Sequence, residues 1–129
     1  MTEDNFKQLL KRIVDSHLPD EDLIFELEGD EIVESIFKMQ NVNHTAIASN
    51  NLQAVDMSSA AAIVGLVPVA MTCYKTYLEL RKLLHDDKLI DQEEVRKSWL
   101  KKLRQHGMTE KKATLIVDDF TQDIIQFAK

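Results

Sequence analysis

The sequence predicts a mainly α-helical fold, a compact domain of about five helices. The chain has 129 residues but only three glycines and two prolines, and this scarcity favours long helices over tight turns. Apolar residues also recur at helical spacing in most segments. Residues 39–74 carry a single charge, at Asp56, although 29% of the whole chain is charged, so this stretch is expected to form the apolar centre.

The length fits a single domain, residues 1–129. In this reading, residues 1–56 hold an acidic helix and a mixed α/β element, and residues 57–129 form a helical core that ends in a helical hairpin. The one cysteine, Cys73, excludes an intramolecular disulfide and suits a reducing compartment. The acidic N-terminus lacks the apolar run of a secretory signal, so a cytoplasmic location is expected.

The first helix is predicted to begin after Thr2 and to end before Pro19. Thr2 can act as the N-cap, and the acidic residues Glu3 and Asp4 suit the positive end of a helix dipole. Proline cannot continue the helix because its ring clashes with the preceding turn. The inner face of the helix is predicted to hold Phe6, Leu9, Leu10, Ile13, Val14 and His17.

The next segment allows two interpretations. Leu23, Phe25 and Leu27 alternate along the chain before Gly29, which indicates a short strand, and Asp30 can then cap a helix. That helix would carry Ile32, Val33, Ile36, Phe37 and Gln40 on one side. The competing interpretation is one β-hairpin that turns at Gly29 and Asp30.

Residues 41–56 are rich in asparagine and in small or β-branched residues. Two short strands, at residues 45–49 and 52–55, could be joined across an Asn-Asn turn, and an irregular loop over the core is the alternative. The alternative fold class is therefore α+β, with a two- or three-stranded antiparallel β element between residues 22 and 56.

Residues 57–74 contain no charged side chain. Eighteen residues fall just short of the roughly twenty that a membrane-spanning helix needs, and Gly65 and Pro68 interrupt the run. A short apolar helix over residues 59–66 is predicted, followed by a break and a longer helix over residues 68–84, with Pro68 in its first turn. Burial in the core or in a subunit interface is expected for this stretch.

The following helix is predicted to begin at Gln92. Asp91 and Glu94 form a capping box, and Ile90 and Val95 form the matching hydrophobic staple. Gly107 stands where a C-cap glycine belongs. The inner stripe is predicted to be Val95, Trp99, Leu100 and Leu103.

The last helix is predicted to be capped by Thr109 and to run to the C-terminus. The join between the two helices, Gly107 and Met108, is short, so the helices must be neighbours. The inner stripe shows the clearest helical period of the chain and consists of Ala113, Ile116, Val117, Phe120, Ile124 and Phe127.

The segment at residues 80–103 reads LRKLLHDDKLIDQEEVRKSWLKKL. It resembles the short helical hairpin of SHOCT-type oligomerisation modules in its leucines, its polar turn, its Leu-Ile pair and its paired glutamates. The resemblance covers about a fifth of the chain, and this sequence lacks the glycine that those modules usually have before the Leu-Ile pair. The resemblance implies pairing of the two helices that flank the turn.

No arrangement of residues indicates a catalytic or metal site. The histidines at positions 17, 44, 85 and 106 are scattered, and none has a second His or Cys at metal-ligand spacing. A thiol in an apolar helix, as expected for Cys73, has a raised pKa and is inert. Phosphate-binding glycine loops and serine elbows are missing from the sequence. The expectation is a protein that is not an enzyme and that uses no cofactor and no metal.

The two ends of the chain have opposite charge. Residues 1–35 carry eleven acids and three bases, whereas residues 95–112 carry seven bases and one acid. The seven bases are Arg96, Lys97, Lys101, Lys102, Arg104, Lys111 and Lys112. They straddle a helix, a turn and a second helix, so nucleic-acid binding through residues 96–112 is an alternative function, although Asp118 and the acids after it would repel phosphate.

The function expected first is a non-enzymatic protein–protein interaction or self-assembly module: an adaptor, an inhibitor or a regulatory subunit, as in bacterial or phage conflict systems. It would use the low-charge stretch 39–74 and the flanking helices to bind a protein partner or itself, as a homo-oligomer. The apolar contact residues expected are Ala61, Ile63, Val64, Leu66, Val67, Tyr74 and Tyr77. A membrane-active protein that inserts residues 57–74 is the second alternative.

Overall fold

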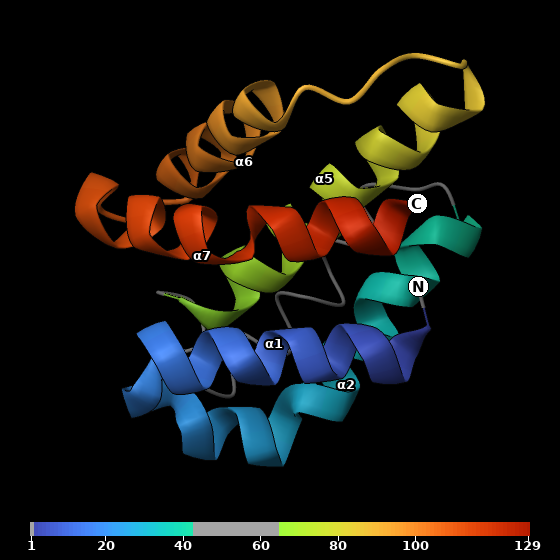
Figure 1. Ribbon diagram of the computed structural model, residues 1–129. Helices are drawn as coiled ribbons and strands as arrows, with labels where there is room; N and C mark the ends of the chain where they lie inside the picture. The colour runs from blue at the N-terminus through green and yellow to red at the C-terminus, as the bar shows by residue number, and fades with distance from the viewer. Residues whose placement is uncertain (1, 43–64) are drawn as a thin grey trace. The chain divides into compact units, whose positions relative to one another are not determined.

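The computed structural model describes residues 2–42 and 65–129 (Figure 1). In chain order they form α1 (Glu3–His17), the 3₁₀ turn η1 (Pro19–Glu21), α2 (Asp22–Val42), α5 (Leu66–His85), α6 (Gln92–Gln105) and α7 (Glu110–Ala128). The described residues contain five α-helices and no strand, which confirms the mainly α-helical fold class.

Contacts within the chain group the residues into two compact units, Thr2–Ala70 and Met71–Lys129. The boundary lies inside α5, whose first turn belongs to the first unit. The single domain that the chain length predicts stays a prediction. Each unit has its own helix caps and apolar interior.

The first unit begins with α1, as predicted. The Oγ1 atom of Thr2 accepts a hydrogen bond from the backbone N–H of Asn5 at 3.1 Å, and the helix ends at His17, just before Pro19. The side chains predicted to face inward are buried, except that His17 is half-buried. The Thr2 cap therefore sets the beginning of α1, and Pro19 sets its end.

The segment after Pro19 corrects the sequence interpretation. α2 runs without a break through Gly29 and Asp30. The strand around Leu23, the hairpin turn at Gly29 and Asp30, and the helix start after Asp30 are therefore wrong. Residues 22–42, where part of the β element was predicted, are helical. The two strands predicted at residues 45–49 and 52–55 fall outside the described residues.

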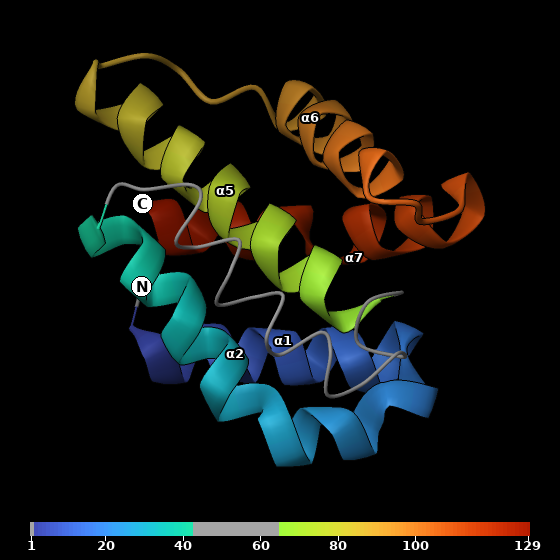
Figure 2. The same ribbon diagram turned by 180° about the vertical axis from the view of Figure 1, so that it is seen from behind.

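The burial of apolar side chains at helical spacing explains why α2 continues through Gly29. Phe25, Ile32, Val33 and Ile36 recur at helical spacing, and all four are buried. A glycine inside a helix costs about 1 kcal/mol, whereas burying one large apolar side chain contributes about 1.5–3 kcal/mol. Figures 1 and 2 both show the first half of α2 lying beside α1.

The start of α5 lies two residues earlier than predicted, at Leu66 instead of Pro68. Pro68 is the third helical residue. The N–H groups of the first helical turn have no intrahelical acceptor, so the N–H that proline lacks costs no helical hydrogen bond at this position. The Oε1 atom of Glu21 accepts a hydrogen bond from the N–H of Leu66 at 2.8 Å. The helix predicted over residues 59–66 lies outside the described residues except for its last two positions.

The second unit contains the helical hairpin that the sequence predicts. Asp91 caps α6 by accepting a hydrogen bond from the N–H of Glu93 at 3.0 Å, and Thr109 caps α7 through the N–H of Lys112 at 3.3 Å. Gly107 has a φ of 92°, a left-handed conformation that favours glycine. Figure 2 shows α6 and α7 side by side, as does Figure 1.

A Schellman motif ends α6. The N–H of Gly107 donates to the carbonyl of Arg104 at 3.0 Å, and the N–H of Met108 donates to the carbonyl of Leu103 at 3.2 Å. The Met108 and Leu103 side chains, at the two positions that are typically apolar in this motif, are both buried. The C-cap glycine predicted at this position is confirmed.

The core of the second unit centres on Trp99, which is completely buried. Its indole N–H donates a hydrogen bond to the Oγ1 atom of Thr72 at 3.0 Å, which ties α6 to α5. Arg81 ties α5 to the end of α7 by donating to the carbonyl of Ala128 at 2.9 Å. Leu100 and Phe127, both predicted as inner-stripe residues, are only half-buried.

Candidate interaction surfaces

Two leucines on α2 are exposed. Leu23 and Leu27 retain 65% and 76% of their accessible surface, whereas Phe25 between them is 2% exposed. Residues four apart in a helix lie on the same face, so the two leucines form one apolar ridge. The sequence interpretation missed them because it placed them with Phe25 in an alternating strand. The helical spacing of the buried α2 residues is the pattern that would have found them.

Acidic side chains surround this ridge. Glu26 and Glu31 are exposed and form no ion pair with any residue in the described parts of the chain. Asp30 pairs with Lys7 of α1. We refer to Leu23, Leu27, Glu26 and Glu31 as the leucine face of α2.

The outer side of α6 carries a shallow hollow of about 420 Å³. It is lined by Lys97, Leu100, Lys101, Arg104 and Gln105, which we call the basic hollow. The half-buried Leu100 provides the apolar part of the lining, and three cationic side chains surround it. Lys97, Lys101 and Arg104 are exposed and form no ion pair with the residues that the structure describes.

The basic cluster predicted at residues 96–112 is not uniform. Arg96 bonds to Asp118 at 2.7 Å and lies 3.5 Å from Glu93, and the hydrogen bond and charge of Asp118 raise the pKa of Arg96. Lys102 pairs with Glu79 at 2.8 Å and donates to Ser98 at 2.7 Å. The exposed members of the cluster are Lys97, Lys101, Arg104, Lys111 and Lys112.

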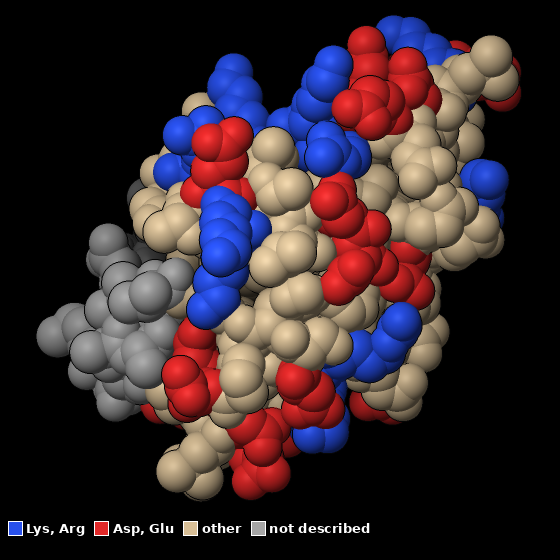
Figure 3. All heavy atoms as spheres, turned by 60° about the vertical axis from the view of Figure 1, so that its left-hand side comes forward, with Lys and Arg blue, Asp and Glu red and all other residues tan. Residues whose placement is uncertain are grey.

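Acidic and basic side chains are mixed on the face that Figure 3 shows, where Lys and Arg are blue and Asp and Glu are red. A nucleic-acid surface would gather the basic side chains in a continuous area that follows the phosphate backbone. The pairing of Arg96 and Lys102 with carboxylates removes two of the seven cations from such an area.

The predicted apolar contact residues fall into two groups. Ala61, Ile63 and Val64 lie outside the described residues. Leu66, Val67, Tyr74 and Tyr77 are buried, with exposed fractions between 0% and 9%. These four side chains therefore have the environment of a protein interior, and their contact with a partner stays a prediction.

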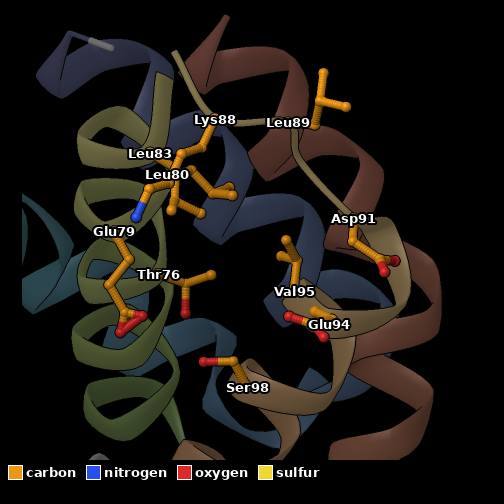
Figure 4. A pocket seen from close by; sticks show the side chains of 10 residues that line it. All are labelled: Thr76, Glu79, Leu80, Leu83, Lys88, Leu89, Asp91, Glu94, Val95 and Ser98. Atoms are coloured by element: carbon orange, nitrogen blue, oxygen red, sulfur yellow. The ribbon is translucent and has the colours of Figure 1, made fainter. Parts of the chain in front are cut away.

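A pocket of about 290 Å³ lies between α5 and α6, under the connection that joins them (Figure 4). It is lined by Thr76, Glu79, Leu80, Leu83, Lys88, Leu89, Asp91, Glu94, Val95 and Ser98. Leu89 at its rim is 96% exposed. The hydroxyl of Thr76 is buried and has no hydrogen-bond partner among the described residues.

The chemistry of this pocket is limited. Its carboxylates stand at the rim, and its lining contains no thiol and no histidine that could act as a nucleophile or as a base near neutral pH. Lys102 already binds the hydroxyl of Ser98, which points toward α5 in Figure 4.

Cys73 and His106 of the second unit have shifted pKa values. Burial raises the pKa of the Cys73 thiol, and the charge of Asp123 adds to this shift, so the thiol stays protonated at neutral pH. Burial lowers the pKa of His106, and the charge of Lys75 lowers it further. The Cys73 side chain is buried, whereas His106 is exposed.

Within residues 2–42 and 65–129, no three His, Cys, Asp or Glu side chains gather as a metal ion would require. Across the same ranges, every helix is too short or too polar to cross a bilayer. Residues 57–64 of the segment considered for membrane insertion fall outside these ranges.

Comparison with protein-family models, with curated proteins and with solved structures finds no match to this chain. The likeness of residues 80–103 to SHOCT-type modules therefore remains a likeness of pattern. Its one structural implication, pairing of the helices that flank the turn, agrees with the hydrogen bonds that join α5 to α6.

Proposed function

We propose that this protein is a non-enzymatic protein–protein interaction module, of the kind that serves as an adaptor, an inhibitor or a regulatory subunit. The observation that carries the proposal is the exposure of Leu23 and Leu27 on adjacent turns of one helix. Scattered apolar residues are normal on a protein surface, but a pair that forms a ridge offers a helix face that a partner's groove can cover.

The charges around the two candidate surfaces support the same function. The leucine face of α2 is acidic and the basic hollow of α6 is cationic. Charged side chains at the rim of an apolar contact accelerate encounter and select the partner more than they add affinity. A chain that holds both kinds of surface can recognise partners of either charge, including a copy of itself.

The test is capture of a protein partner, or of the protein itself, by the purified full chain. The Leu23→Asp and Leu27→Asp double variant should lose the association, measured by light scattering after size-exclusion chromatography and by pull-down. Leu89→Asp is the matched control because Leu89 is exposed but lies outside the leucine face. Association that survives the double variant, or that Leu89→Asp abolishes equally, would count against the proposal.

Nucleic-acid binding is a second candidate function, supported by the five exposed cationic side chains of the α6–α7 hairpin. The test is retention on heparin or DNA. Retention that falls steeply between about 50 and 200 mM salt would favour it. Passage through the column at the lower salt concentration would remove this candidate.

A further inference from the structure

We propose that the chain self-associates, with the leucine face of α2 in one copy bound to the basic hollow of α6 in a second copy. The inference rests on the proposed interaction function and names the partner and the two surfaces that meet.

The apolar parts of the two surfaces are complementary. Leu23 and Leu27 project from successive turns, so their side chains are neighbours on one face of α2. The hollow on α6 offers a recess beside Leu100, which remains only half-buried within its own chain. Contact between the ridge and the recess would remove apolar surface from water on both sides, which is the main favourable term in association.

The charged parts are complementary as well. Glu26 and Glu31 flank the leucines, and the cations Lys97, Lys101 and Arg104 flank the recess. None of these five side chains forms an ion pair with a described residue of its own chain. Pairing across the contact would therefore break no ion pair of the described structure, and it would orient the two copies as they meet.

A second copy is the partner that this distribution favours. Both halves of the contact occur on one chain. The leucine face lies in the acidic segment, residues 1–35, and the basic hollow lies in the basic segment, residues 95–112. A partner of different chemistry would need only one of the two surfaces. Because the two surfaces differ, each copy offers one surface of each kind, the leucine face and the basic hollow, to a second copy.

This geometry allows a complementation experiment. Leu27→Lys places a cation in the leucine face, where it would meet the cations of the hollow, and Lys101→Glu places an acid in the hollow, where it would meet Glu26 and Glu31. Each variant alone should remain monomeric in sedimentation velocity, with the dissociation constant raised at least about tenfold. An equimolar mixture should form a dimer, because each variant retains the one intact surface that the other needs.

The controls match each change. Leu89→Lys repeats the change from leucine to lysine at an exposed position outside both surfaces, and Lys82→Glu repeats the charge reversal on the exposed side of α5. Both controls should assemble like the parent chain. Association of the parent chain should also weaken as salt rises, since the flanking charges are exposed.

Three results would overturn the inference. The parent chain could be a monomer at every concentration, the mixture of variants could stay monomeric, or Lys82→Glu could weaken assembly as much as Lys101→Glu. Assembly of the parent without complementation in the mixture would reject this pair of surfaces and leave the proposed interaction function standing. A monomeric parent chain that captures another protein through Leu23 and Leu27 would also reject this pair of surfaces and leave the proposed interaction function standing.

Discussion

Glu21 caps a helix that begins 45 residues later in the chain: its Oε1 atom accepts the backbone N–H of Leu66 at 2.8 Å. The first N–H groups of a helix have no intrahelical partner, and a carboxylate is a favourable acceptor at this positive end. Glu21 is only 7% exposed, so this bond joins η1 to the start of α5 within the interior of the first unit.

Removal of this cap should destabilise the protein. Glu21→Ala is expected to lower the free energy of unfolding by about 1–3 kcal/mol, because the N–H of Leu66 would stay buried without its acceptor. Glu21→Gln should cost less, since the amide oxygen can still accept. The measurement is urea unfolding followed by far-UV circular dichroism. Gln8→Ala is the control at an exposed position of α1, and an equal loss there would contradict the capping role.

Gly65 should be coupled to Glu21. A Cβ atom at position 65 would lie 2.2 Å from the Oε2 atom of Glu21 and 3.1 Å from Cδ2 of Leu18, so alanine must displace the capping carboxylate. Gly65→Ala is therefore expected to cost about as much as Glu21→Ala, about 1–3 kcal/mol. In the double variant the two losses should not add. Strict additivity in the same urea experiment would show that the two sites act independently.

Two buried threonines of α5 should respond in opposite ways to the same substitution. Thr72→Val removes the acceptor of the Trp99 indole N–H and should cost about 1–3 kcal/mol, because the donor stays buried without a partner. Thr76→Val removes a buried hydroxyl that has no partner among the described residues, so it should be neutral or stabilising. Thermal and urea unfolding of the two variants test this, and a stability loss in Thr76→Val equal to that in Thr72→Val would refute it.

The lowered pKa of His106 predicts a pH dependence of stability. The folded state binds the proton less tightly than the unfolded state, so stability falls as pH drops through the unfolded pKa of about 6.5. His106→Gln should flatten this part of the profile. Lys75→Gln should raise the pKa of His106, because it removes the neighbouring positive charge, and NMR titration of the imidazole measures this directly. A pKa that does not change in Lys75→Gln would exclude this contribution.

Much of the fold could be predicted because its determinants are local. Thr2, Asp91 and Thr109 each accept an N–H within the next three residues, and Gly107 ends α6 in the left-handed conformation that its position predicts. These features depend on short stretches of chain. The sequence therefore reports them without knowledge of the tertiary structure.

The remaining features depend on residues that lie farther along the chain. Alternation over Leu23, Phe25 and Leu27 fits a strand and also a helix with one buried residue, and only the helical spacing of the buried residues farther along α2 decides between them. The bond between Glu21 and Leu66 joins positions that no local pattern connects. The exposure of Leu23 and Leu27 was not predicted because their alternation with Phe25 also fits a strand. The start of α5 was not predicted because it depends on the bond from Glu21.

The location of Trp99 in the second unit has a practical consequence for fluorescence spectroscopy. The chain has one tryptophan and two tyrosines, and all three lie in the unit Met71–Lys129. Intrinsic fluorescence therefore reports on that unit, while residues 2–70 contribute no emission from either residue type. A melting curve from emission and one from circular dichroism would coincide only if both halves of the polypeptide unfold together.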